Sequence, residues 1–354
     1  MSDAQRSGEG QIIMENELIV PGAALDDHGN VAEAGWARSW VRSFNRETIR
    51  FDADRLKEWN YFFVGDENYG IGVSLANVGS FHRMSCSFMD YKNNRQINRM
   101  SLSPASPGAV AMGLSPFDDV HFRNEEAEGV HAYRGGSAAL AFTYADFDGP
   151  HRLNAAVFLD AYESDTLQHV FPFDGEPGLF FLCHKAVNYD VSGVISIGDF
   201  SYELKPETAF AAKDWGRGVW PRQSTPFWSC THGRVEGRTF GWNLGYRYSE
   251  YTGATENALF VDGVAHKLGV VAFEIQDDET SFTKPWFLRD ADGRMDVVFH
   301  PVLDRSSSAP VGIGYSADQH QVFGYFSGRV VLDDGAELRF DRLFGFAEKL
   351  VNDW

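Results

Sequence analysis

The feature that most constrains the fold is a pair of turn residues that recurs between short runs of alternating or aromatic-rich sequence. Each pair is an acidic residue followed by glycine, and the pairs are Glu236-Gly237, Asp262-Gly263, Asp292-Gly293 and Asp334-Gly335. Glycine adopts the left-handed backbone of a two-residue hairpin turn, and the flanking runs suit paired strands. The pattern therefore predicts a series of antiparallel β-hairpins.

The first half of the chain continues this pattern. Polar clusters separate runs rich in Phe, Tyr, Val and Ser across residues 59–79 and 83–102. Helical periodicity is scarce, and we expect helices only near Asp52 to Trp59 and from Arg342 to Trp354. Runs such as Ala258 to Val261 are apolar on both alternating faces, which favours strands covered on two sides. The sequence thus predicts an all-β fold of closed or nearly closed barrels, with a ligand held inside.

The length of 354 residues exceeds what one hydrophobic core usually supports, so we expect two domains. An aromatic run followed by a glycine-rich run occurs once in each half, beginning at Trp59 and at Pro226. This similarity between the two halves has two alternative explanations, internal duplication and chance reuse of a β pattern. We predict an N-terminal domain over residues 1–190 and a C-terminal domain over residues 191–354 that ends in a short helix.

Charge excludes several classes of partner. The chain has 31 basic and 50 acidic residues, a net charge of −19, which repels nucleic acid and anionic lipid. Residues 1–10 lack the apolar core of a signal peptide, and no stretch approaches the ~20 apolar residues of a membrane span. We therefore expect a cytoplasmic protein that binds no nucleic acid and inserts in no membrane. The sequence leaves a homodimer open.

Motifs of cofactor and metal chemistry are missing from the sequence. Cys86, Cys183 and Cys230 lie far apart and form no CxxC pair, so buried thiols are expected in place of disulfides or a zinc site. The chain has no GxSxG, HExxH or GxxxxGK[ST] sequence, and Gly70-Ile71-Gly72 lacks the context of a dinucleotide fingerprint. The expectation is no metal and no cofactor.

The densest group of candidate site residues is the segment Lys213 to Pro221, with sequence KDWGRGVWP. Its glycines allow sharp bending and close approach of another group, and Trp215 and Trp220 offer apolar walls. Asp214 beside Trp215 is a candidate proton donor if the pocket is dry. The alternative is that Arg217 pairs with Asp214 and pins the local structure, or that Arg217 binds the ligand.

Glu256 and His184 are the other candidate catalytic residues. Glu256 is placed in a strand with two apolar faces, so it either titrates opposite Asp214 or pairs with a buried cation, Arg217 or Lys185. His184 follows an apolar strand and is a proton carrier or a structural residue.

Candidate substrate-binding residues lie in the aromatic strands and after the apolar strand that ends at Cys183. A buried amide in the GWNLGY sequence needs hydrogen-bond partners, which a ligand could supply. With those of the Lys213–Pro221 segment, the candidate binding residues are Trp215, Arg217, Trp220, Trp228, Asn243, Lys185, Asn188 and Tyr61.

The segment from Lys213 to Leu268, together with residues 316–324 and Gly345 to Lys349, resembles a family described as domain of unknown function 2804. That family is distantly similar to two-barrel lipocalin-like proteins, which include carotenoid hydratases, tocopherol cyclases and some Diels–Alder cyclases. The resemblance implies a calycin-type pair of antiparallel β-barrels and acid–base chemistry on a hydrophobic molecule. In the hydratases an acid in an acid–aromatic–glycine turn is thought to protonate an alkene, and Asp214-Trp215-Gly216 is the nearest counterpart, without the histidines of that motif.

Two classes of function follow. The first is a cofactor-independent lyase, hydratase or isomerase that acts on a small aromatic or isoprenoid-like substrate in a buried pocket, with the Trp rings shielding a cationic intermediate. The second is a carrier or sensor of hydrophobic ligands, in which the acid and the arginine anchor a polar head group. A structural protein with filled barrels is a third alternative.

Overall fold

The computed structural model describes residues 15–79, 81–104, 112–161, 163–247, 253–276, 281–311 and 315–353. Within these ranges the chain forms strands β1 to β26 and one 3-10 helix, Arg46–Thr48, and no α-helix. Nearly all strand pairs are antiparallel, and the exception among the named strands is β1 (Gly22–Ala23) with β3 (Arg42–Ser43). The prediction of an all-β, lipocalin-like fold is confirmed.

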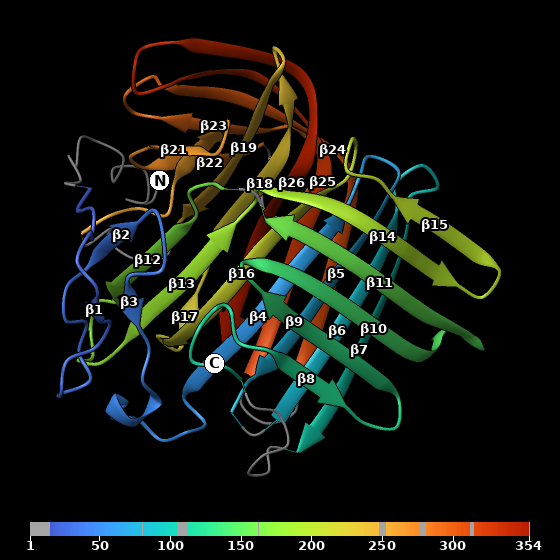
Figure 1. Cartoon of the computed structure of the whole chain (residues 1–354), viewed down its shortest axis with the longest axis horizontal. Helices are drawn as coiled ribbons and strands as arrows, with labels where there is room; N and C mark the ends of the chain where they lie inside the picture. Colours follow the sequence, from blue (N-terminus) through green and yellow to red (C-terminus); the bar gives the residue numbers. More distant parts are fainter. Residues whose placement is uncertain are drawn as a thin grey trace, which may run out of the picture.

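Two sheets enclose the core of the first half (Figure 1). The first sheet has eight strands, in the order β2 (Gly35–Ala37), β12 (Leu167–Pro172), β13 (Phe180–Ala186), β16 (Phe210–Val219), β4 (Leu56–Gly65), β5 (Tyr69–Asn77), β6 (Phe81–Asp90) and β7 (Arg95–Pro104). The second has six, in the order β15 (Phe200–Leu204), β14 (Tyr189–Ile197), β11 (His151–Ala161), β10 (Ser137–Asp148), β9 (Ala127–Arg134) and β8 (Val120–Arg123). In Figure 1 the green strands β9, β10, β11 and β14 cross in front of the blue strands β4 to β6, as in two curled sheets packed face to face.

A third sheet curls around the core of the second half. Its strands run in the order β21 (Val264–Lys267), β20 (Ala258–Val261), β19 (Arg238–Tyr246), β18 (Phe227–Val235), β26 (Glu337–Asp353), β25 (Tyr315–Val331), β24 (Met295–Val311), β23 (Trp286–Asp290) and β22 (Val271–Ile275), and β17 (Gln223–Ser224) pairs with β26. Strands β19 and β22 approach each other although they are not hydrogen-bonded neighbours, so the sheet closes toward a half-barrel.

All four acidic–glycine pairs lie in hairpin turns, as predicted. Glu236-Gly237 joins β18 to β19 with φ values of 52° and 83°, and Asp262-Gly263 joins β20 to β21 with 50° and 82°. Both residues of each pair are left-handed, which matches the right-handed twist of the strands that they connect.

Both helix predictions are wrong. Residues 52–55 form a turn that leads into β4, and the segment from Arg342 onward belongs to β26 as far as Asp353. Strand β26 is hydrogen-bonded to β25 on one side and to β18 on the other. Because apolar side chains lie on both of its faces, the alternation that marks a half-buried strand is hidden in its sequence.

The division of the chain into domains stays a prediction. Residue 190 lies inside β14, and β14, β15 and β16 all pair with strands of the first half. The third sheet takes its strands from β17 onward. Sheet membership therefore favours a boundary between Val219 and Gln223 over one at residue 190.

Aromatic side chains join the two halves. Phe63 of β4 packs against Phe323 of β25 and Phe346 of β26, with ring centroids 5.0 and 5.7 Å apart. This junction cluster is separate from the clusters of buried apolar side chains inside the two halves.

Candidate functional site

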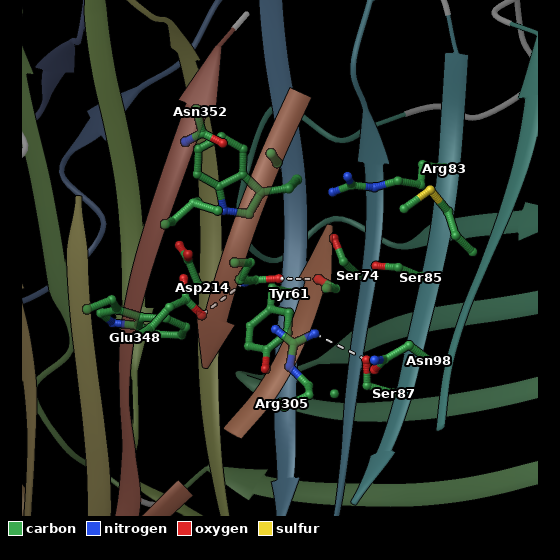
Figure 2. A pocket seen from close by; sticks show the side chains of 18 of the residues that line it. Tyr61, Ser74, Arg83, Ser85, Ser87, Asn98, Asp214, Arg305, Glu348 and Asn352 are labelled. Atoms are coloured by element: carbon green, nitrogen blue, oxygen red, sulfur yellow. Dashed lines mark hydrogen bonds between the residues drawn. The ribbon is translucent and has the colours of Figure 1, made fainter. Parts of the chain in front are cut away.

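A cavity of about 350 Å³ lies at the junction of the two halves (Figure 2). Its walls come from β4 to β7 and β16 of the first half and from β18 and β24 to β26 of the second. The volume is within the range of small-molecule sites in proteins.

Strand alternation decides which side chains line this cavity. In β5 and β6, Val73, Leu75, Met84 and Cys86 face the first core. Their neighbours lie on the opposite face and give the cavity a floor of one glycine, Gly72, and three serines, Ser74, Ser85 and Ser87. The second half follows the same rule. Val322 of β25 and Ala347 of β26 lie in the second core. Polar side chains of β24 to β26 line the cavity: Arg305, Ser307, Gln319 and Glu348.

Trp59, Trp220 and Trp228 form the apolar wall, with Tyr61 beside them. The Trp228 indole N–H donates to Asn243 Oδ1 at 2.8 Å, and the Tyr61 hydroxyl donates to Gln321 Oε1 at 3.0 Å. These hydrogen bonds fix the polar ends of the rings, so their apolar faces remain for a ligand.

Asp214 lines the cavity and is held by a buried cation. Lys185 Nζ lies 2.8 Å from Asp214 Oδ1 and 3.8 Å from Glu256 Oε2, and it sits 4.6 Å from the centre of the Trp228 ring. The contact between Lys185 Nζ and Asp214 Oδ1 is an ion pair that does not have the angles of a hydrogen bond. Burial alone would lower the pKa of Lys185, but Asp214 and Glu256 outweigh it and raise the pKa above its ordinary value. Lys185 is therefore a permanent cation.

Glu348 is a second carboxyl group at the cavity, and its surroundings are different. It is 6% exposed, and its Oε2 accepts a hydrogen bond from Gln319 Nε2 at 3.0 Å. Burial raises its pKa to about 7, against the lowering effects of Arg305 and Gln319, and the charge of Asp214 raises it further. Near neutral pH a large fraction of Glu348 thus carries a proton.

The two carboxyl groups point into the same side of the cavity in Figure 2. One is the anionic partner of an ammonium group, and the other is protonated over much of the neutral range. Carboxyl groups kept in different environments can serve as the acid and the base of one reaction.

Comparison with known proteins identifies the family. The family model described as domain of unknown function (DUF2804) matches residues 15–354, almost the whole chain. The chain belongs to the DUF2804 family. No curated protein matches the chain.

Solved structures with the same architecture have very different sequences from this DUF2804 chain. A structure titled CghA with Sch210972 is 13% identical, with a TM-score of 0.50, and the match covers 84% of this chain and 88% of that one. A putative AttH from Nitrosomonas europaea is 10% identical, with a TM-score of 0.54 and coverages of 89% and 98%. Kievitone hydratase from Nectria haematococca is 11% identical, with a TM-score of 0.48 and coverages of 90% and 96%. At these identities the first two matches show a shared fold.

The Lys213–Pro221 segment of the DUF2804 chain is an extended strand, not a turn. Within β16, alternation sends Asp214 to the cavity and both Trp215 and Arg217 to the opposite face. Gly216 allows the Trp59 ring to pack directly against the backbone of β16, because a Cβ at this position would lie 2.3 Å from the ring. The predicted bend is thus wrong and the predicted close approach is confirmed.

Arg217 faces neither Asp214 nor the cavity. Its Nε lies 3.4 Å from Glu58 Oε1, its Nη1 donates to the Trp59 carbonyl at 2.9 Å, and its guanidinium stacks 4.0 Å from the Trp215 ring centre. Burial lowers its pKa to about 9, while Glu58 opposes that shift. The pairing of Arg217 with Asp214 is therefore ruled out by strand alternation.

Other predicted residues also lie away from the cavity. His184 pairs in register with Trp215 on the far face, where its ring nitrogen lies 3.1 Å from Thr166 Oγ1, and burial lowers its pKa well below the ordinary value. Asn188 Nδ2 donates to the Asp165 carbonyl at 3.3 Å. Asn243 sits behind Trp228, and its Nδ2 donates to the Glu256 carbonyl at 2.8 Å. Of the predicted residues, Asp214, Tyr61, Trp220 and Trp228 line the cavity, and Lys185 supports it from behind.

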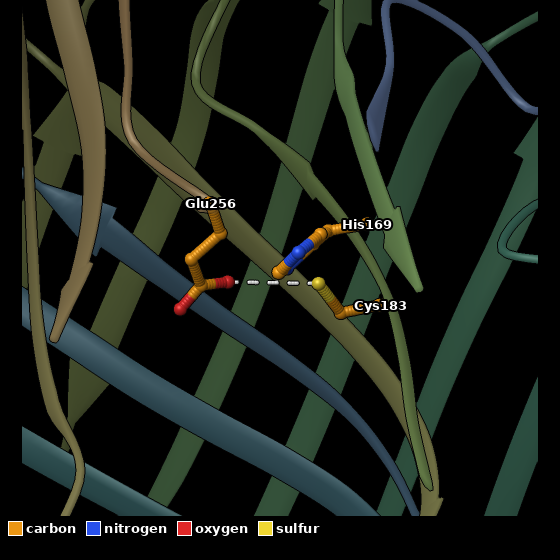
Figure 3. A group of neighbouring side chains, drawn as sticks. All are labelled: His169, Cys183 and Glu256. Atoms are coloured by element: carbon orange, nitrogen blue, oxygen red, sulfur yellow. Dashed lines mark hydrogen bonds between the residues drawn. The ribbon is translucent and has the colours of Figure 1, made fainter. Parts of the chain in front are cut away.

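Glu256 is buried as predicted, but it precedes β20 instead of lying in a strand. It forms a compact group with His169 and Cys183, whose ligand atoms lie within 4.8 Å of one another (Figure 3). Cys183 Sγ donates to Glu256 Oε2 at 3.5 Å, and His169 Nε2 lies 3.0 Å from the Ala254 carbonyl. The residue types suit zinc, but the Lys185 ammonium beside Glu256 already supplies a positive charge. We therefore describe the group as a buried hydrogen-bonded cluster.

Sequence reasoning missed Glu348, Arg305 and the serine floor as site residues. Glu348 lies in the Gly345–Lys349 motif that carries the family resemblance, and Gln319 lies in the 316–324 motif. Glu348 and Gln319 could have been chosen from the sequence, because each is a polar residue inside an apolar stretch of a family motif. Arg305 and the serines gave none, because nothing in the sequence tells which face of a strand meets the other half.

Among the residues that the structure describes, no helix is both long and apolar enough to span a membrane.

Proposed function

We propose that this protein is an acid–base enzyme of the lyase, hydratase or isomerase type, acting on a small apolar molecule in the junction cavity. Glu348 is the proton donor, and Asp214, held by Lys185, is the anionic partner. The observation that carries the proposal is a buried carboxyl group with a pKa of about 7 that shares an aromatic-walled cavity with a second, ion-paired carboxylate. A general acid works best when its pKa lies near the operating pH.

The reaction needs no reactant besides water. The Glu348 carboxyl group gives its proton to one alkene carbon, whose π electrons form the new C–H bond and leave a cation on the neighbouring carbon. Loss of a proton from an adjacent carbon to Asp214 yields an isomer, whereas attack of water on the cation and loss of one water proton to Asp214 yields a hydrate. In both cases the proton on Asp214 passes to solvent and Glu348 takes one back before the next turnover. The faces of Trp59 and Trp220 support the intermediate by cation–π attraction.

The contacts of Lys185 favour Glu348 over the two acids expected from the sequence. Asp214 and Glu256 both lie next to the Lys185 ammonium, which supplies a counter-charge that Glu348 does not have at this distance among the described residues. Independence from cofactors and a cytoplasmic location remain predictions from the sequence.

The test is a turnover screen with small alkenes, enones and allylic alcohols, run in D₂O so that proton transfer labels the product. Once a substrate is found, Glu348→Gln should lower kcat by about a hundredfold or more, the usual effect of losing a general acid. Turnover by the wild type should fall as pH rises through about 7, where Glu348 loses its proton.

Arg134→Gln is the control, because Arg134 is a surface residue 80% exposed in its side chain and should leave kcat unchanged. A Glu348→Gln variant that turns over at the wild-type rate would show that Glu348 is not the donor. Asp214→Asn separates the two acids: an unchanged rate would remove Asp214 from the mechanism and keep Glu348.

A carrier of hydrophobic ligands is the second candidate, and the Lys185–Asp214 ion pair favours it, because an acid held by an ammonium can be purely structural. Native mass spectrometry of protein purified from its own host would reveal a co-purifying ligand. Recovery of that ligand chemically unchanged from both wild type and Glu348→Gln supports the carrier, whereas conversion by the wild type alone supports the enzyme.

A further inference from the structure

Arg305 is a buried cation in the wall of the cavity. It is 6% exposed and takes part in none of the ion pairs found among the described residues. Its Nη1 donates to Ser87 Oγ at 3.2 Å, while its Nε and Nη2 are buried and have no hydrogen-bond partner in the part of the chain that the structure describes. A buried guanidinium with two unused donors is costly unless an acceptor meets it.

The two unused donors lie on one edge of the guanidinium. The Nε–H and Nη2–H bonds of arginine are parallel, and their spacing matches the two oxygens of a carboxylate. The donor bound to Ser87 lies on the other edge, so Ser87 orients the fork without using it. Figure 2 shows Arg305 between the acidic side of the cavity and the strands that carry Ser74, Ser85 and Ser87.

The surroundings of Arg305 complete a polar compartment. Ser74 and Ser85 are cross-strand neighbours in β5 and β6, and Gly72 stands opposite Ser87. The glycine adds no side chain to the floor, and the Tyr61 hydroxyl lies above it, 3.1 Å from where a Cβ would be. Arg83 also lines the cavity, and its Nε is buried and has no hydrogen-bond partner among the residues described. In a chain with 50 acidic and 31 basic residues, two arginines in one cavity that form no ion pair within the described ranges need an explanation.

We propose that this compartment binds the carboxylate group of the substrate, with Arg305 as the bidentate anchor and Arg83 and the serine hydroxyls as further donors. The substrate is then an amphipathic acid, with an aromatic or isoprenoid body against Trp59, Trp220 and Trp228 and a carboxylate at the opposite end. The inference rests on the proposed function, because it assigns the substrate's carboxylate group to the other end of the cavity in which Glu348 and Asp214 act.

Binding of the substrate carboxylate to Arg305 also affects the protonation of Glu348. Arg305 lowers the pKa of Glu348, since its positive charge favours the ionised acid. A bound carboxylate neutralises that charge, so Glu348 holds its proton more firmly when the substrate is present. The substrate thereby promotes the protonated form of the proton donor.

The test uses three probes that share a naphthyl ring, the near-isosteric pair 2-naphthoate and 2-naphthamide and the larger 2-naphthyl phosphate, with binding to the full chain measured by isothermal titration calorimetry at pH 8. We expect naphthoate to bind the wild type at least about tenfold more tightly than the amide, the size of one charge-assisted bidentate contact. Arg305→Gln should reduce this preference to less than about threefold.

Arg99→Gln is the matched control, because Arg99 lines the same cavity but is exposed, so it removes an equal charge without removing the buried fork. It should keep most of the preference, since water and salt screen an exposed charge. If Arg305→Gln does not fold, Arg305→Lys keeps the charge without the fork and should bind naphthoate more weakly than the wild type.

Three results would overturn the inference: equal affinity of the wild type for acid and amide, a preference that survives Arg305→Gln, or tighter binding of the phosphate than of the carboxylate. None of them bears on Glu348 as proton donor, which the turnover of Glu348→Gln decides. Conversely, an active Glu348→Gln variant that still prefers naphthoate would keep the carboxylate compartment and reject the catalytic acid.

Discussion

At the scale of single residues, burial and the nearest charge decide what each acid can do. Asp214 and Glu348 are both carboxyl groups at the same cavity, but Lys185 lies 2.8 Å from the first, while an amide of Gln319 contacts the second at 3.0 Å. The ammonium supplies a full counter-charge, and the amide supplies a hydrogen bond only. Burial therefore dominates for Glu348 and raises its pKa to about 7.

This shift predicts a specific pH dependence of stability. The folded chain keeps the Glu348 proton up to about pH 7, whereas the unfolded chain releases it near the ordinary value of 4.5. The folded state binds more protons in that window, so the free energy of unfolding falls as pH rises from about 4.5 to 7, by about 3 kcal/mol from this group. The Glu348→Gln variant should not lose this stability as pH rises, because glutamine does not titrate.

Urea unfolding at pH 5 and pH 8 measures the effect as a difference between variant and wild type, which cancels the contributions of the buried histidines. Glu348→Gln should gain stability relative to the wild type between the two pH values, and Glu203→Gln, at a side chain 71% exposed, should not. Parallel pH profiles for the wild type and Glu348→Gln would contradict the raised pKa of Glu348.

At the scale of elements, strand β16 shows how alternation divides one motif between two environments. Asp214 reaches the cavity, and Trp215 and Arg217 pack on the other face, against Trp40 and Glu58. Gly216 is needed because the Trp59 ring occupies the place of its side chain. The glycine therefore sets the position of an aromatic wall of the cavity.

Gly216→Ala should displace the Trp59 ring toward the cavity, because a rigid indole cannot yield to a Cβ 2.3 Å away. We expect a loss of about 1–3 kcal/mol in the free energy of unfolding, the usual cost of overpacking, together with weaker binding of 2-naphthoate. Gly269→Ala is the control, since its nearest atom would be an ordinary contact at 3.6 Å. Equal losses for both variants would contradict a specific clash between a Cβ at position 216 and the Trp59 ring.

At the scale of the whole molecule, the site exists because two curled halves meet. Each half buries its own apolar cluster, and the cavity lies between the faces of the sheets that point away from these clusters. Phe323 belongs to β25 and packs against Phe63 and Tyr91 of the first half, with ring centroids 5.0 and 5.3 Å apart. The aromatic junction therefore holds the cavity walls in place.

Phe323→Ala should lower the free energy of unfolding by about 3–5 kcal/mol, as expected for a fully buried phenylalanine. It should also make the connection at residues 220–226 more sensitive to limited proteolysis, because the halves separate more readily. Phe142→Ala removes a ring of equal size from the first core and is the matched control. The same cleavage at residues 220–226 in both variants would mean that the junction does not couple the halves.

Local sequence determined the strands and their turns. The acidic–glycine pairs predicted four hairpins correctly, since a left-handed turn depends only on the residues within it. The composition predicted an all-β chain, and two residues of the predicted Lys213–Pro221 segment, Asp214 and Trp220, line the cavity. These are properties of short stretches of chain.

Only the tertiary structure decided which face of each strand meets the cavity. In β13, in β16 and at residues 345–349 of β26 both faces are buried, so the sequence does not indicate which face meets the cavity, and Arg217 and His184 lie on the face away from it. Glu348 and Arg305 come together from β26 and β24 with Asp214 of β16, more than 90 residues earlier in the chain. Their protonation and pairing depend on charges brought near by folding, because electrostatic interactions act through space and not along the sequence.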